Sequence, residues 1–88
     1  MRMKKGFILK NVANKWIVVP IGEEAVHFNG LLTLNESGRI LFEQLQENDV
    51  TTEMLVKTLM DYYDVDKMTA RMDVEAFMDK LREKELLE

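Results

Sequence analysis

The chain has 88 residues, no cysteine and a formal net charge of −4 at pH 7. This length gives room for one modest hydrophobic core, so we expect a single domain over residues 1–88 and no large enclosed cofactor. The lack of cysteine excludes disulfides and thiolate metal sites, and the negative charge opposes nonspecific binding to nucleic acid. No apolar segment reaches transmembrane length, and Lys10 and Asn11 interrupt the only candidate signal-peptide core, so we expect a cytoplasmic protein with no membrane partner.

The first twenty residues predict a β-hairpin. Residues 6–12 alternate apolar side chains between two faces, and residues 14–19 form a nearly continuous run of β-favouring residues. Ala13-Asn14 supplies a tight turn between them. Pro20 ends the second strand because it cannot donate a hydrogen bond to the ladder.

Residues 26–34 predict a third strand that passes directly into a helix. Asn29-Gly30 interrupts this segment and predicts a bulge or bend. Asn35 ends the strand, because its side chain can accept a hydrogen bond from the amides that open a helix at Glu36.

Three amphipathic helices are expected to follow. The first spans residues 36–46, and the second begins at a cap on Thr51 or Thr52 and ends at residue 63. The third begins at a cap on Asp66 and ends at about residue 84. Leu86 and Leu87 are expected to fold back onto the core. The order of these elements predicts an α+β, winged-helix-like fold in which a three-stranded antiparallel sheet precedes three α-helices.

The residue types that carry catalysis are sparse. His27 is the only histidine, and its nearest acid in the sequence is Glu24, so a metal or proton-transfer site would need partners that the sequence does not indicate. The glycines match no nucleotide-binding fingerprint. We therefore expect no catalytic residues, no metal and no cofactor.

Charge is distributed unevenly along the chain. Every charged residue before Glu23 is basic, whereas acids dominate from Glu36 onward. A positive strand region favours a peptide or protein partner with acidic residues. The alternative is that the lysines only protect exposed strand edges against aggregation.

Several methionines and one strand edge indicate binding of a peptide. A short strand beside a helix start leaves backbone groups that an extended peptide can pair with. Met60 and Met78 are expected to fill the core, whereas Met68 and Met72 lie off the apolar stripe and would line a groove if exposed.

Other functions remain open from the residues alone. A winged-helix order is typical of DNA-binding proteins, although acids on the last helix would repel phosphate. The chain could also be an adaptor that docks an enzyme and binds no peptide. The same strand edge could pair with a second copy of the chain to form a homodimer.

Four segments together resemble the PqqD family, the small proteins of pyrroloquinoline quinone biosynthesis and their relatives, which are called RiPP recognition elements. These are Leu34-Asn35-Glu36-Ser37-Gly38 with Leu41 and Leu45; Val50-Thr51-Thr52-Glu53; Tyr63 before an Asp-rich turn; and Asp73-Val74-x-x-Phe77-x-x-x-Leu81 running to Leu86-Leu87. The resemblance covers nearly the whole chain.

The resemblance implies a peptide chaperone that is not an enzyme. Family members hold the leader segment of a precursor peptide against the third strand and third helix, and present it to a modifying enzyme, often a radical S-adenosylmethionine protein. Carried onto this chain, the resemblance implies a strand edge from Val26, Phe28, Leu31, Leu32 and Thr33. It implies side-chain pockets from Arg71, Met72, Glu75, Met78 and Arg82. It does not identify the precursor or the pathway.

Overall fold

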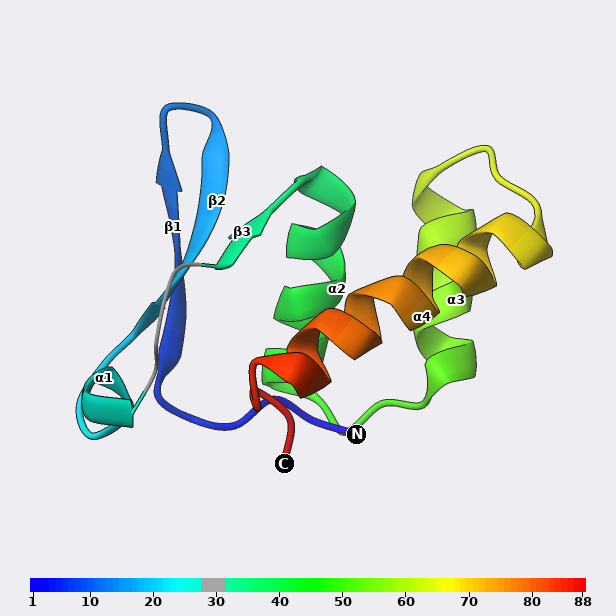
Figure 1. The fold of residues 1–88 in the computed structure, drawn as a ribbon. Helices are drawn as coiled ribbons and strands as arrows, with labels where there is room; N and C mark the ends of the chain where they lie inside the picture. The colour runs from blue at the N-terminus through cyan, green and yellow to red at the C-terminus, as the bar shows by residue number, and fades with distance from the viewer. Residues whose placement is uncertain (28–31) are drawn as a thin grey trace.

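The computed structural model describes residues 1–27 and 32–88. Its elements are β1 (Phe7–Val12), β2 (Lys15–Pro20), α1 (Glu24–His27), β3 (Leu32–Leu34), α2 (Glu36–Glu47), α3 (Thr52–Tyr62) and α4 (Lys67–Glu83) (Figure 1). The strands form one antiparallel sheet in the order β1-β2-β3. The predicted α+β fold, three strands followed by three long helices, is therefore confirmed, with the short α1 as an addition.

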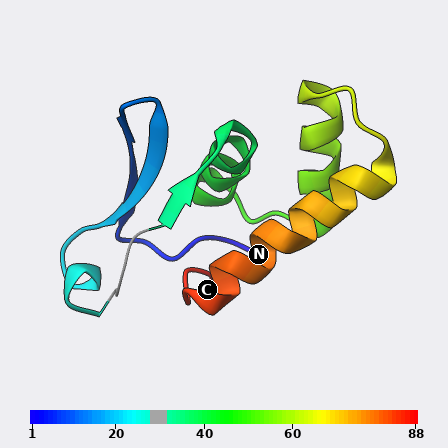
Figure 2. The ribbon, with the colours of Figure 1, turned by 45° about the horizontal axis from the view of Figure 1, so that its top comes forward.

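A two-residue turn joins β1 to β2. Ala13 and Asn14 both have positive φ, 52° and 66°. A type I′ turn requires this at both central residues, and its twist matches the right-handed twist of the two strands. The turn places Val12 opposite Lys15 and Phe7 opposite Pro20. Figures 1 and 2 show this hairpin at one end of the molecule and α3 at the other, with α2 between them.

The third strand is shorter than predicted. Val26, expected on its edge, lies instead in α1, where its side chain is 82% exposed. The reason is local: Ala25 N–H donates to Gly22 O and Val26 N–H donates to Glu23 O, which closes a helical turn where the predicted strand would begin. The predicted bend at Asn29-Gly30 lies outside the described residues.

Each long helix begins at a capping side chain that satisfies a free backbone amide. The side-chain oxygens of Asn35, Thr51 and Asp66 accept from Gly38 N at 2.8 Å, Met54 N at 3.2 Å and Thr69 N at 2.7 Å, respectively. The predicted caps are confirmed, and the Asn35 cap fixes where β3 ends and α2 starts.

The Asp66 cap gives a pH-dependent contribution to stability. The Thr69 backbone amide holds the pKa of Asp66 below its ordinary value, because the hydrogen bond favours the charged carboxylate. A depressed pKa stabilises the fold at neutral pH, and this contribution is lost as pH falls through the folded-state pKa. We expect NMR titration to place the Asp66 midpoint below 3.8. Asp66→Ser keeps a capping side chain without a titrating group, so its free energy of unfolding should decrease less at acid pH than that of the wild type. An equal decrease in both proteins would contradict this prediction.

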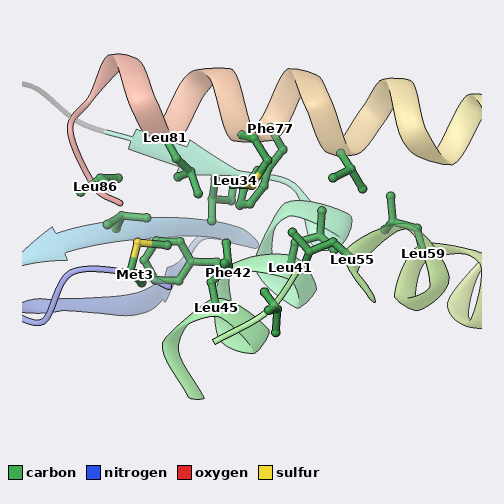
Figure 3. Close-up of a cluster of buried hydrophobic side chains, with 14 of the residues drawn as sticks. Met3, Leu34, Leu41, Phe42, Leu45, Leu55, Leu59, Phe77, Leu81 and Leu86 are labelled. Carbon is green, nitrogen blue, oxygen red and sulfur yellow. The ribbon is translucent and has the colours of Figure 1, made fainter. Parts of the chain in front are cut away.

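One hydrophobic cluster joins the inner face of the sheet to the helices. Phe42 and Val18 are fully buried, and Leu34 of β3 points toward Phe77 and Leu81 of α4 (Figure 3). The other buried side chains are those of Met3, Phe7, Leu32, Leu41, Leu45, Val50, Leu55, Val56, Leu59, Ala70, Val74, Met78 and Leu86.

The ends of the chain close this core, and the methionines divide between core and surface. Leu86 is fully buried and Leu87 pairs with Met3, so the predicted return of the C-terminal residues is confirmed. Met78 fills the core as expected. Met60 does not, because it is 41% exposed beside the charged residues of α3. Among the described residues, no helix is both long and apolar enough to cross a bilayer.

Candidate functional site

A groove runs between the end of β3, the start of α2 and one flank of α4. We call it the β3–α4 groove; it has a volume of about 450 Å³. Its lining residues are Thr33, Leu34, Asn35, Gly38, Asp73, Ala76, Phe77 and Lys80. The groove therefore combines a sheet edge with a helix surface.

The floor of the groove is apolar and rigid, because its two large side chains also belong to the core. Leu34 is only 4% exposed and Phe77 only 8% exposed. Gly38 lets α2 begin close to them, since a Cβ there would lie 3.3 Å from the Leu34 Cβ atom. Side chains that enter the groove would meet a preformed apolar surface.

The backbone of Thr33 faces away from the sheet. In an antiparallel pair, hydrogen-bonded and non-hydrogen-bonded residue pairs alternate. Ile21 N–H donates to Gly6 O at 2.8 Å, so the alternation directs the backbone groups of Ile17 and Val19 toward β1. Those of Trp16 and Val18 must then point toward β3.

The same alternation assigns the backbone groups of β3. Trp16 pairs with Leu34 and Val18 pairs with Leu32, so Leu32 and Leu34 use their N–H and C=O on β2. Thr33 directs its N–H and C=O to the outer edge, where no other described residue bonds to them. This edge is the part of β3 that can accept a further strand.

Two opposite charges stand on the helix side of the groove. Asp73 and Lys80 are exposed, and neither forms an ion pair within residues 1–27 and 32–88. They are seven residues apart, about 10 Å along a helix, which corresponds to about three residues of an extended chain. The groove therefore offers one acidic and one basic group to a bound segment.

A polar cluster holds the neighbouring ends of β2 and α2 together. Trp16 Nε1 donates to Glu36 at 3.2 Å, and Arg39 lies over the Trp16 ring, 5.2 Å from its centroid. Arg39 also donates to Glu36 and, at 2.7 Å, to Glu43. The hydrogen bond from Arg39 holds the pKa of Glu36 below its usual range, and these carboxylates raise the pKa of Arg39. Sequence reasoning missed this cluster, because the residue spacing does not reveal the pairing of Trp16 with Leu34.

The predicted strand residues divide into three groups. Thr33 lies on the groove and carries the outward backbone groups. Leu32 is buried, and its N–H faces β2, so it is not the edge donor. Val26 belongs to α1, and Phe28 and Leu31 lie outside the described residues.

The predicted helix residues are not among those that line the groove. Met78 is 1% exposed and belongs to the core, whereas Met72 is 64% exposed. Arg71 donates to Glu53 of α3, and Arg82 lies beside residues of the chain ends. Glu75 is exposed without lining the groove.

The reason is the phase of the helix. At 100° per residue, Arg71, Glu75 and Arg82 flank one side of the apolar stripe of α4. Asp73 and Lys80 flank the other side, and this second side faces β3. The helical periodicity of the sequence distinguishes the two flanks of α4, but it does not indicate which flank faces the sheet.

Comparisons with known proteins bear on this geometry. A family model described as coenzyme PQQ synthesis protein D (PqqD) matches residues 15–87, a stretch that contains all the groove-lining residues. No curated protein sequence matches the chain. The fold is similar to that of a solved structure titled "TbiB1 in Complex with the TbiA(beta) Leader Peptide", with a TM-score of 0.76 and 22% sequence identity over 100% of this chain and 95% of that one.

Proposed function

Because the chain belongs to the PqqD family, we propose that it binds the leader segment of a ribosomally made precursor peptide and presents it to a modifying enzyme. The observation that carries this proposal is the outward N–H and C=O of Thr33 beside a groove with an apolar floor. The similar solved structure, by its title, is a complex with a leader peptide, which supports the same class of ligand. In this proposal the chain supplies binding and its partner supplies the chemistry.

The proposed binding mode is addition of a strand to β3. The leader pairs with the Thr33 backbone, and alternate side chains of the leader enter the groove against Leu34 and Phe77. Main-chain pairing is independent of the leader's sequence, so the groove must provide selectivity. The leader orders on binding, and we expect dissociation constants from roughly micromolar to high nanomolar.

Presentation acts through effective concentration. A leader held beside an enzyme makes the encounter between the core peptide and that enzyme intramolecular, which raises the reaction rate without catalytic groups from this chain. We propose a radical S-adenosylmethionine protein as the modifying enzyme and the cytoplasm as the location. The enzyme class is suggested by the family, and the location by the lack of cysteine in the sequence.

The binding test uses synthetic leader segments from short reading frames that neighbour the gene for this chain. Amide NMR shifts should change at Thr33, Leu34 and along α4 from Asp73 to Lys80. Calorimetry should give one site in the stated affinity range. Shifts confined to α3 would place the peptide elsewhere and contradict the proposed site.

Asp73 and Lys80 should determine which comes first along a bound peptide, its basic residue or its acidic residue. In a displayed library of random extended peptides, the wild-type chain should select sequences with a basic residue and an acidic residue about three positions apart. The exchange variant Asp73→Lys with Lys80→Asp should select the reverse order at the same net charge. Equal charge order in both selections would show that these two groups do not contact the ligand.

A further inference from the structure

The sheet has a second face, which the core does not use. Phe7, Val18, Leu32 and Leu34 point inward, so their neighbours along each strand point outward. The register then places six outward side chains together, and we call this surface the outer sheet face. Its members are Ile8, Lys10 and Val12 of β1 and Lys15, Ile17 and Val19 of β2.

This surface is apolar and basic. Ile8 is 37% exposed and Val12 is 53% exposed, while Ile17 and Val19 of the central strand are partly buried. Lys10 and Lys15 are exposed, and neither pairs with an acid in the part of the chain that the structure describes. None of the six residues carries a carboxylate.

Charge decides which occupant suits the outer sheet face. The same face of a second copy would add two more lysines and no carboxylate, which is unfavourable. Nucleic acid would meet four apolar side chains and a chain with a net charge of −4. An apolar protein surface with carboxylates at its edge would bury the apolar residues and pair both lysines.

We propose that the outer sheet face docks the modifying enzyme through such an apolar and acidic surface. The identity of the partner as the modifying enzyme rests on the proposed function. Thr33 lies opposite Ile17, so β3 continues the outer sheet face as far as the edge where the leader would add. A strand paired there would present its own outward side chains beside the docked enzyme.

The test uses the purified modifying enzyme encoded beside the gene for this chain. One variant carries Lys10→Glu with Lys15→Glu, and another carries Ile8→Thr with Val19→Thr, which retains β-favouring residues at paired positions. Each should weaken binding of the enzyme by at least about tenfold. Both should bind the leader peptide within about twofold of the wild-type affinity.

A matched control carries Lys57→Glu with Lys67→Glu, which changes the net charge equally on the helical side of the molecule. It should bind the enzyme like the wild type. Undiminished enzyme binding by both outer-face variants would overturn the proposal. So would a wild-type dimer in sedimentation velocity that the lysine variant dissociates, because that result assigns the face to a second copy.

Failure of the proposed function would look different. If no leader peptide bound the wild-type chain but the outer-face variants still bound the enzyme more weakly, the result would support the docking surface and contradict leader binding.

Discussion

Thr33→Pro is expected to weaken leader binding by at least about tenfold while leaving the fold intact. The substitution removes the outward N–H of β3 and places a ring where an added strand would lie. Proline is tolerated here because this N–H does not bond to β2. Calorimetry with a leader peptide measures the affinity, and thermal unfolding measures the stability.

Two neighbouring substitutions make this result specific. Thr33→Val keeps the N–H and the β-branched shape, so its affinity should remain within about twofold of the wild type. Leu32→Pro removes an N–H that faces β2, so it should lower stability rather than remove an edge contact. Full leader affinity in a folded Thr33→Pro protein would exclude strand addition at this edge.

Ala76→Arg is expected to abolish measurable leader binding at micromolar concentrations. Ala76 is exposed and lines the groove, so a long side chain there would occupy the space above Leu34 and Phe77. Alanine and arginine both favour helices, and the change should cost little stability. Competition between wild-type and variant protein for a labelled leader gives the affinity ratio.

Met72→Arg is the matched control for this change. It places the same side chain on an exposed position of α4 that does not line the groove. Its leader affinity should stay within about twofold of the wild type. If Met72→Arg abolished binding and Ala76→Arg did not, the peptide would not occupy the β3–α4 groove.

Local chemistry made most of the fold predictable. Asn35, Thr51 and Asp66 each satisfy amides within three residues, so capping can be inferred from a short sequence window. The hairpin was also predictable, because Ala13-Asn14 supplies the two-residue turn between its strands and Pro20 ends the second strand. The start of the third strand was less predictable, since α1 depends on a single turn of backbone hydrogen bonds.

The site required information that no local window contains. Two features decide it: which flank of α4 meets β3, and which β3 residue directs its backbone outward. The first depends on how α4 packs against α3 and the shared core, and the second on the hydrogen-bond alternation that passes from β1 through β2. The structure therefore places Thr33 on the β3–α4 groove, whereas the α4 residues named from the sequence do not line it.

In the proposed binding mode, Leu34 and Phe77 serve both recognition of the leader and folding. Each forms the floor of the groove and each is buried in the core, where truncation of such a side chain costs about 2–5 kcal/mol. In this mode, we expect new specificities to arise at Asp73, Ala76 and Lys80, which line the groove but are exposed and lie outside the core. Engineered retargeting has the same freedom: a library confined to these three positions would sample new specificities on an unchanged scaffold.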